Sequence, residues 1–180
     1  MRISETKLRD VHIVELERMQ DERGSFARSF CIDEFRDASV NFEVHQANIS
    51  VNNFAGTVRG MHFQTQPSPE TKVVRCTRGA MYDVALDLRP DSDTYCQWFG
   101  IELNPQNGAA LLIPAGCAHG FQSLTDDTEV HYLMSGRYDP SAANGVRHDD
   151  EAFGIQWPLP VASISDKDLG WPDFDRQVNT

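Results

Sequence analysis

Short segments of the type that forms β-strands occupy the middle of the chain, and the first of them, residues 44–51, alternates between apolar and polar residues. Gly, Pro, Asn and Asp separate these segments, which cover residues 44–51, 73–76, 81–88, 97–103, 110–113 and 129–134. A period of two residues places successive side chains on opposite faces of a strand. Because many short strands at roughly even spacing are typical of a sandwich or barrel, the pattern predicts an all-β fold.

Helical periodicity is scarce outside these segments. Residues 33–37 are a modest helix candidate, and the tail after Gly145 is rich in Asp, Pro and Trp with little periodicity. We expect this tail to pack over the mouth or an edge of the barrel as irregular structure and a few short helices. A doubly wound α/β fold is disfavoured, because the chain lacks long helices between the strands and has no GxGxxG or GxxxxGK[ST] loop.

Composition and charge narrow the possible partners. The chain has 180 residues, of which 40% are hydrophobic, and we expect one domain over residues 1–180. A formal net charge of -11 opposes encounter with nucleic acid or with an anionic membrane surface. The N-terminus lacks the apolar core of a signal peptide, and no apolar run approaches the ~20 residues that span a bilayer. We therefore expect a cytoplasmic protein that binds neither nucleic acid nor membrane.

The cysteines and histidines do not have the spacing of a metal site. The cysteines at positions 31, 76, 96 and 117 form no CxxC pair, so free thiols are expected. The segment from Pro114 to His119 matches the PxGxxH signature of the second cupin motif, in which a turn delivers a histidine to the barrel interior. The first cupin motif of a metal-dependent cupin supplies two more histidines and a glutamate, but the corresponding segment here offers His62 alone. We therefore expect no metal, with His62 and His119 as bases or hydrogen-bonding groups.

Three side chains near these motifs are candidates for proton chemistry. A lone strand histidine is often only a satisfied, partly buried residue, but Arg59 and Lys72 lie near His62 in the sequence and favour a reactive site. Composition alone slightly favours a solvated strand end for Lys72. Alternation places Tyr132 on the same face as Val130, towards the barrel interior, where a tyrosine more often fills core than donates a proton.

Taken together, the motifs resemble those of the dTDP-4-dehydrorhamnose 3,5-epimerase family, whose members act on 4-keto-6-deoxy sugar nucleotides. Each motif is weak alone, but the ordered set extends over nearly the whole chain, at residues 21–26, 46–50, 59–64, 72–75, 79–89, 113–121, 138–140, 155–158 and 164–168. The resemblance implies a double-stranded β-helix, the cupin or jelly-roll barrel, with a few short helices. It also implies a homodimeric isomerase of deoxysugar or polysaccharide biosynthesis.

The resemblance further implies that the enzyme epimerises its sugar at C3, C5 or both through an enolate. The C4 ketone acidifies the protons on the neighbouring carbons, so the reaction needs no redox cofactor and we expect none. By this analogy His62 is the base, Asp168 orients it, and Lys72 stabilises the enolate oxygen. Tyr132 would return a proton from the opposite face of the ring, which inverts the centre.

The same resemblance assigns further residues to the binding of a small sugar nucleotide. They are Arg59, His119 and Tyr138 around the sugar and phosphates, and Arg23, Phe26, Gln46 and Asn48 around the nucleotide, some of them across the dimer interface. Arg28 also falls in the nucleotide-binding set, but the family usually carries glutamate there, as it does at Ala143. We therefore expect a sugar nucleotide that differs from the dTDP-linked substrate or is bound differently at its distal end.

Three other functions stay open at this point. An epimerase that acts at C3 alone, on a sugar nucleotide not linked to dTDP, would carry the same residues, because the sequence does not show how the sugar reorients. A non-catalytic sugar-binding cupin would be expected to lack an acid or a base, yet the four proposed catalytic residues are all present. A ketoisomerase or a metal-dependent cupin isomerase is the remaining alternative.

Overall fold

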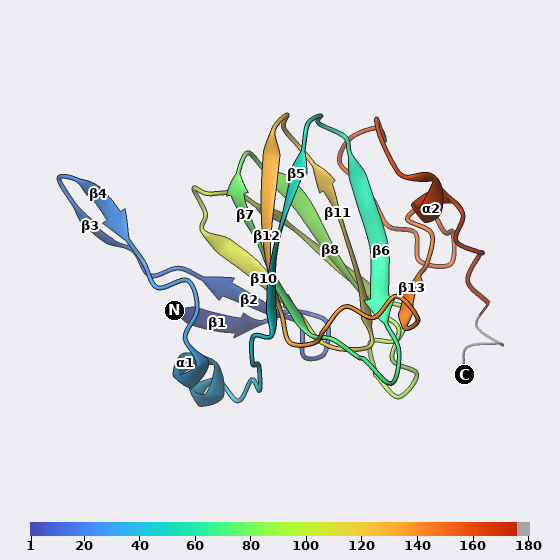
Figure 1. Ribbon diagram of the computed structural model, residues 1–180, viewed down its shortest axis with the longest axis horizontal. Coiled ribbons are helices and arrows are strands. Elements are labelled where there is room, and N and C mark those ends of the chain that lie inside the picture. The colour runs from blue at the N-terminus through green and yellow to red at the C-terminus, as the bar shows by residue number, and fades with distance from the viewer. Residues whose placement is uncertain (176–180) are drawn as a thin grey trace.

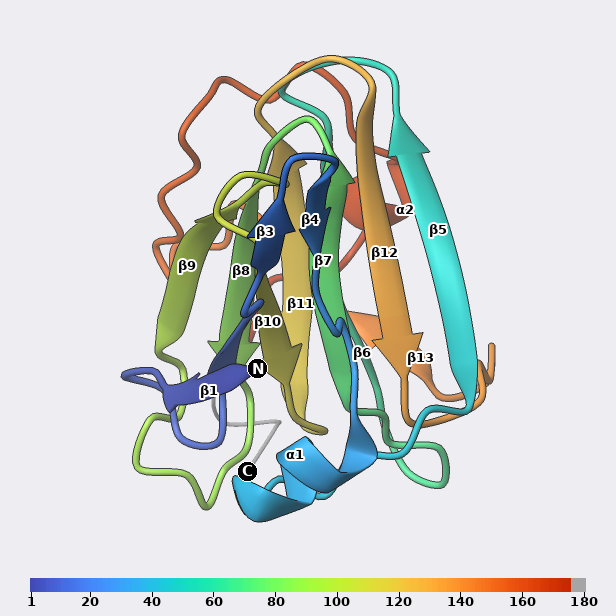
Figure 2. The same cartoon turned by 90° about the vertical axis from the view of Figure 1, so that its left-hand side faces the viewer.

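The computed structural model describes residues 1–175 of the chain and arranges the strands in two facing antiparallel sheets (Figures 1 and 2). The first sheet has the order β1 (Arg2–Glu5), β2 (His12–Glu15), β10 (Ala109–Ile113), β7 (Lys72–Arg78), β12 (Thr128–Met134) and β5 (Gln46–Asn52). The second has the order β13 (Ala143–Gly145), β6 (Val58–Gln64), β11 (Cys117–Ser123), β8 (Met81–Asp87) and β9 (Trp98–Leu103). Strands far apart in the sequence pair in both sheets, as in a jelly roll. The predicted all-β fold is confirmed.

Other elements of the described chain lie outside these two sheets. A hairpin of β3 (Met19–Asp21) and β4 (Gly24–Phe26) projects from the body of the molecule (Figure 1). Helix α1 (Ile32–Asp37) covers part of the outer side of the first sheet, at the position that the sequence predicts (Figure 2). Helix α2 (Asp166–Leu169) lies beside β6. None of the helices within residues 1–175 is long and apolar enough to cross a membrane.

Side-chain alternation divides the apolar residues into a central core and outer clusters. The central core lies between the sheets and includes Val74, Leu111, Phe121 and Val130. An outer cluster beneath α1 consists of aromatic rings stacked on aliphatic side chains of the first sheet: Phe30, Phe35, Phe42, Val14, Val73 and Leu112. Apolar side chains are therefore buried on both faces of the first sheet.

The tail after Gly145 covers the outer face of the second sheet. Met61 and Val84 point outward from this sheet and are fully buried beneath Phe153 and Ile155. Residues 163–168, near the end of the tail, reach the space between the sheets. The expectation that the tail packs over the mouth or an edge of the barrel therefore holds for residues 163–168 but not for residues 153–155, because the apolar outer side chains of β6 and β8 need a cover.

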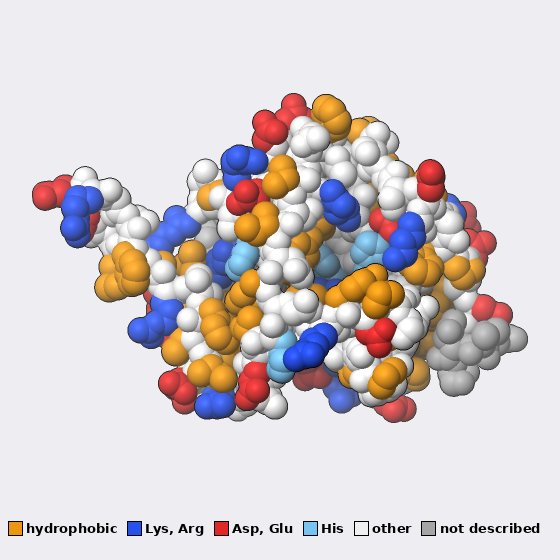
Figure 3. Space-filling model, in the orientation of Figure 1, with side chains coloured by type: hydrophobic (Ala, Val, Ile, Leu, Met, Phe, Trp, Pro, Cys, Tyr) orange, Lys and Arg blue, Asp and Glu red, His pale blue; other side chains and the backbone are white. Residues whose placement is uncertain are grey.

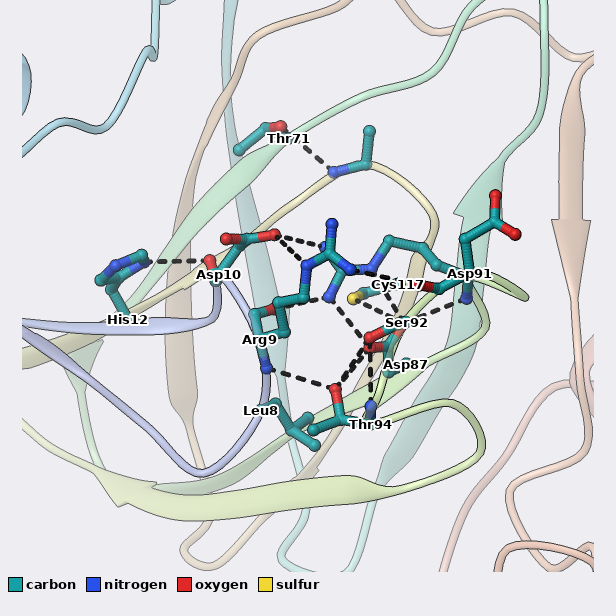
Figure 4. Close-up of polar contacts among 12 residues, drawn as sticks. Leu8, Arg9, Asp10, His12, Thr71, Asp87, Asp91, Ser92, Thr94 and Cys117 are labelled. Carbon is teal, nitrogen blue, oxygen red and sulfur yellow. Dashed lines mark hydrogen bonds and ion pairs between the residues drawn. The ribbon is translucent and has the colours of Figure 1, made fainter.

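A buried polar cluster fixes the end of β8 (Figure 4). Asp87 is fully buried and accepts hydrogen bonds of 2.6–3.0 Å from Arg89, Ser92 and Thr94. Arg89 also donates to Asp10, in the turn between β1 and β2. Burial alone would raise the pKa of Asp87, but these hydrogen bonds outweigh it and hold the pKa well below its ordinary value. The cluster thus joins β8 to the following loop and to the first β-turn of the chain.

Candidate active site

The space between the sheets changes from apolar to polar towards one end, where it forms a cavity of about 650 Å³. Inward-facing residues of β5, β6, β7, β11 and β12 line it together with the segment after β12 and residues of the tail. Among them are Asn48, Ser50, Arg59, His62, Lys72, His119, Tyr132, Tyr138, Lys167 and Asp168. Figure 3 shows histidine atoms inside a hollow on this face, with Lys and Arg side chains near its rim. The volume lies in the range of small-molecule sites.

His62 and Asp168 form a hydrogen-bonded pair in this cavity. His62 Nε2 lies 2.6 Å from Asp168 Oδ1, and the His62 side chain is 42% exposed whereas that of Asp168 is 5% exposed. Because an ionised carboxylate accepts but does not donate, Nε2 carries the proton of the neutral ring and Nδ1 keeps its lone pair. The pair therefore leaves Nδ1 as a base with a fixed ring orientation.

Several hydrogen-bond donors stabilise the ionised form of Asp168. Burial alone would raise the pKa of Asp168, but the hydrogen bond with His62 and further hydrogen bonds from Gly60 and Ser165 keep the pKa below its ordinary value. The Gly60 N–H lies 3.3 Å from Asp168 Oδ2. Ser165 caps α2 by accepting from the backbone N–H of Asp168 at 3.1 Å, so the helix start places the carboxylate against β6.

Two glycines let β6 and β11 approach closely beside the site. A Cβ atom at Gly60, whose φ is +130°, would lie 2.5 Å from the Cα of Gly120 and 2.9 Å from the carbonyl oxygen of His119. A side chain at either glycine would push the two strands apart. Their absence of side chains lets His62 and His119 stand opposite each other as paired residues of neighbouring strands.

His119 forms a second histidine–carboxylate pair, deeper in the cavity. His119 Nε2 lies 2.7 Å from Asp83 Oδ1, and both side chains are buried. Burial lowers the pKa of His119 below its ordinary value despite the opposing effect of Asp83. The ring is therefore neutral near pH 7, with its Nε2 proton donated to Asp83 and its Nδ1 able to accept a hydrogen bond.

Lys72 and Tyr132 supply an ammonium and a phenol to the same cavity. Lys72 Nζ lies 3.1 Å from Glu70 Oε1 in a buried ion pair. Burial raises the pKa of Tyr132 well above its ordinary value, so its hydroxyl stays protonated near neutral pH. The ring of His119 stands edge-on to Tyr132, with ring centroids 6.0 Å apart. Alternation predicted the inward orientation of Tyr132 together with Val130, and this is confirmed.

Arg59 carries a second cation to the cavity from β6. Its Nε donates to Asn52 Oδ1 at 2.7 Å, which fixes the guanidinium group at the wall of the cavity. Cations that line a cavity in a chain of net charge -11 favour an anionic ligand. A base, an ammonium, a protonated phenol and a fixed guanidinium together suit proton removal from a carbon beside a carbonyl group on an anionic molecule.

Comparison with known proteins identifies the family of this chain. The sequence model of the family described as dTDP-4-dehydrorhamnose 3,5-epimerase matches residues 5–176. The chain belongs to this family. A dTDP-4-dehydrorhamnose 3,5-epimerase of Sinorhizobium fredii is 40% identical over 166 residues, which cover 92% of this chain and 85% of the relative. The predicted resemblance and the predicted isomerase class are thereby confirmed.

Other members of the epimerase family are similarly close in sequence or structure. The crystal structure of a dTDP-4-dehydrorhamnose 3,5-epimerase from Bacillus anthracis, with TDP and PPi bound, has a TM-score of 0.93 and 37% identity, and covers 96% of this chain and 99% of that one. A dTDP-4-dehydrorhamnose 3-epimerase of Streptomyces niveus is 36% identical over 169 residues, covering 93% of this chain and 81% of the relative. The relatives of this chain therefore include enzymes named for one stereocentre as well as for two.

Within this epimerase fold, two predicted nucleotide contacts lie on the projecting hairpin. Arg23 lies in the turn between β3 and β4, and its guanidinium pairs with Asp21 at 2.6 Å. Phe26, at the end of β4, is 68% exposed. Both residues lie outside the cavity of their own chain, so their predicted contact with substrate stays a prediction that requires a second chain.

Two more predicted residues make contacts within the fold rather than line the cavity. Arg28 pairs with Glu34 of α1 at 2.7 Å. Gln46 Oε1 accepts a hydrogen bond of 2.7 Å from the backbone N–H of Tyr138, which holds the segment that carries the exposed Tyr138 ring. Ala143, at the other position that departs from the family pattern, lies in β13 and lines the cavity.

The structure also brings residues to the site that the sequence reasoning missed. They are Glu70, Asp83, Ser50 and Lys167. Alternation within residues 81–88 could have found Asp83, because it shares the inward face with Ala85 in an otherwise apolar strand. The Ser50 hydroxyl is buried without a hydrogen-bond partner among residues 1–175. In that part of the chain, no three His, Cys, Asp or Glu side chains are grouped to hold a metal ion.

Proposed function

We propose that the chain epimerises a 4-keto-6-deoxy sugar nucleotide at C3, C5 or both, in deoxysugar biosynthesis and in the cytoplasm. The observation that carries this proposal is the 2.6 Å hydrogen bond between His62 and Asp168, which presents a base to a cavity shared with Lys72 and Tyr132. Membership of the epimerase family supports it. The TDP and PPi bound by the Bacillus anthracis relative support a sugar nucleotide as the ligand class.

The proposed reaction begins with proton transfer from carbon to His62. Nδ1 takes the proton from the carbon beside the C4 ketone, and the electron pair of the broken C–H bond forms the enolate with its charge on the C4 oxygen. The Lys72 ammonium stabilises this oxyanion. No electrons enter or leave the substrate, so the step needs no oxidant or reductant.

The proposed second half returns a proton to the same carbon from the other face. The Tyr132 hydroxyl donates it, which its raised pKa permits because the phenol stays protonated near neutral pH. The ketone is restored and the centre is inverted. After this step His62 carries one extra proton and Tyr132 lacks one, and exchange with water resets both groups.

A homodimer is part of the proposal, because the hairpin extends away from its own site. Met19 and Phe26 are 65% and 68% exposed on the projecting hairpin, so neither is buried by the part of the chain that the structure describes. We place Arg23 and Phe26 at the nucleotide end of the cavity of a second copy. Mixing His62→Ala chains with Arg23→Ala chains tests this. A mixed dimer would contain one complete site, so activity returns upon subunit exchange if Arg23 acts on the partner chain.

Two outcomes of that mixing experiment would contradict the arrangement. A monomer by sedimentation equilibrium at working concentration would exclude it. So would a lack of restored activity in a sample whose subunit exchange is demonstrated by a mass-tagged chain. Wild type mixed with the His62→Ala chain is the matched control, because it gives the activity of dimers with one intact base.

The nucleotide part of the substrate is proposed to differ from dTDP or to be bound differently at its distal end. Arg28 and Ala143 support this, since neither can supply the carboxylate that the family pattern has at their positions. Thermal shift with a panel of nucleoside diphosphates tests it. Stabilisation by another nucleoside diphosphate but none by dTDP would support a changed specificity, whereas tight binding of dTDP would contradict it.

Epimerisation at C3 alone is the second candidate, because the Streptomyces niveus relative is a 3-epimerase at 36% identity. Incubation in heavy water with a panel of 4-keto sugar nucleotides distinguishes the two. Deuterium at both C3 and C5 of the sugar supports a 3,5-epimerase, and deuterium at C3 alone supports a 3-epimerase. No incorporation with any member of the panel would favour a non-catalytic sugar-binding protein.

A further inference from the structure

A buried carboxylate accompanies the lysine of the site. The side chains of Lys72 and Glu70 are 6% and 8% exposed, and Nζ lies 3.1 Å from Oε1. A buried ammonium without a partner is costly and tends to lose its proton. The described part of the chain, residues 1–175, pairs Lys72 with Glu70 and with no other carboxylate. Glu70 therefore offsets the burial of the cation.

Glu70 is itself held by an amide at the end of β6. Gln64 Nε2 donates to Glu70 Oε2 at 3.1 Å and also lies within hydrogen-bond distance of the carbonyl oxygens of Ser68 and Arg137. Gln64 Oε1 accepts from the backbone N–H of Asp139 at 2.8 Å, which fixes the orientation of the amide. With one oxygen bound to Gln64, Glu70 keeps the other directed at Lys72.

We propose that Glu70 is the positioning residue of Lys72, which keeps the ammonium charged and directed at the oxygen that becomes negative in the reaction. The inference rests on the proposed function, since it takes the C4 oxygen of the substrate as the target of Lys72. An ammonium has three N–H groups, so one can bind Glu70 and another the substrate oxygen. A neutral amine would lose most of the electrostatic stabilisation of an enolate.

Other charged or titratable groups face the same cavity and are left unchanged by a substitution at Glu70. They are Arg59 and His62 from β6, His119 from β11 with its partner Asp83 from β8, Tyr132 from β12, Tyr138 from the segment that follows β12, and Lys167 and Asp168 from α2. His119 and Lys72 oppose each other's positive charge. A change in the pH profile of Glu70→Gln therefore reports on the protonation of Lys72 and on the electrostatic repulsion between Lys72 and His119.

The test compares Glu70→Gln with wild type and with Glu102→Gln, an exposed glutamate of β9 that serves as the matched control. Exchange of the C3 and C5 protons is followed from pH 6 to pH 10. We expect kcat to fall roughly tenfold, less than the ~10²–10³ loss of deleting a transition-state donor. We expect KM to change little. The alkaline limb, the fall of kcat at high pH, should shift to lower pH by about one unit, as expected when an ammonium loses its charge partner. Glu102→Gln should match wild type.

A double-mutant cycle separates action through Lys72 from a structural role. If Glu70 acts through Lys72, then adding Glu70→Gln to Lys72→Met causes no further loss of kcat. Losses that multiply in the double variant would overturn the proposal. So would a Glu70→Gln enzyme with unchanged kcat, or one with lower kcat but an unmoved alkaline limb. Glu70→Asp keeps the negative charge and should retain the alkaline limb of the wild-type pH profile of kcat. This variant serves as a second test if Glu70→Gln does not fold.

A measurement without substrate distinguishes failure of this inference from failure of the proposed function. Cyanate carbamylates the neutral form of an amine, and peptide mass spectrometry measures its rate at Lys72 as a function of pH. In Glu70→Gln the midpoint of this profile should move down by about one pH unit. An unmoved midpoint would overturn the positioning role even if wild type exchanges sugar protons. Conversely, a moved midpoint with no exchange by wild type would sink the proposed function alone.

Discussion

Substitution of Asp87 by Asn should destabilise the fold without altering the chemistry of the cavity. Asp87 accepts hydrogen bonds from Arg89, Ser92 and Thr94, and Asn offers one acceptor oxygen and an amide group that only donates. The change leaves the partly buried Arg89 without its main carboxylate, although Asp10 still accepts from it at 2.8 Å. Removing one partner of a buried ion pair costs ~3–5 kcal/mol.

The remaining contact with Asp10 places the expected loss at the lower end of this range. A loss of about 3 kcal/mol corresponds to a fall in Tm of about 6–12 °C for a domain of this size. Differential scanning calorimetry at pH 7 measures it. Asp93→Asn, an exposed residue of the same loop, is the control and should stay within about 0.5 kcal/mol of wild type.

The pH dependence of this difference follows from the lowered pKa of Asp87. A depressed pKa in the folded state gives stability above the ordinary pKa of about 3.9, and this stability is lost as the pH falls below that value. The gap in Tm between wild type and Asp87→Asn should therefore narrow between pH 5 and pH 3. A gap below about 2 °C at pH 7 would refute the role of the cluster, as would a gap that stays constant down to pH 3.

Other predictions concern the site directly. Asp168→Asn should lower kcat by roughly 10²–10⁴ with little change in KM, because the ring of His62 loses its fixed tautomer; wild-type kcat in a steady-state assay would contradict this. Tyr132→Phe should keep proton exchange with solvent but lower formation of the inverted sugar by roughly 10²–10⁴. NMR of the sugar in heavy water separates the two signals, and normal inversion would exclude Tyr132 as the donor. Gly120→Ala would place a Cβ 2.5 Å from Met61 Sδ, so we expect the free energy of unfolding to fall by about 1–3 kcal/mol, measured by thermal scanning. An unchanged Tm would mean that the two strands can separate freely and would contradict this.

Most strands in the middle of the chain were predictable from the sequence, among them β10, all of whose residues are buried, whereas β1, β2 and β11 were missed. β8 and β12 each carry an inward and an outward set of side chains, which a period of two reveals. β11 was not recognised as a strand, because Cys117–Ser123 mixes polar residues and Gly120 with apolar ones without a period of two, and because it directly follows the turn at Pro114–Gly116. The three-residue strands β3, β4 and β13 are too short for a periodic signal.

The site was only partly predictable, because its partners come from distant parts of the chain. His62 and Asp168 are 106 positions apart, and their pairing was suggested by the family resemblance rather than by any local pattern. Glu70 lies two residues before Lys72, yet a charged residue beside a lysine also suits a solvated loop. Its role became visible only when the fold buried both side chains beside Gln64. The position of Arg23 and Phe26 on a projecting hairpin likewise depends on tertiary structure.

The most direct test of the proposed chemistry is the rate at which His62→Asn exchanges the sugar C3 and C5 protons in heavy water. His12→Asn, a β2 residue whose ring bonds the Asp10 carbonyl outside the cavity, is the matched control. The account predicts exchange by wild type and by His12→Asn with a suitable 4-keto sugar nucleotide. It predicts no detectable exchange by His62→Asn, which should still bind the nucleotide. Exchange by His62→Asn at the wild-type rate would contradict the assignment of His62 as the base.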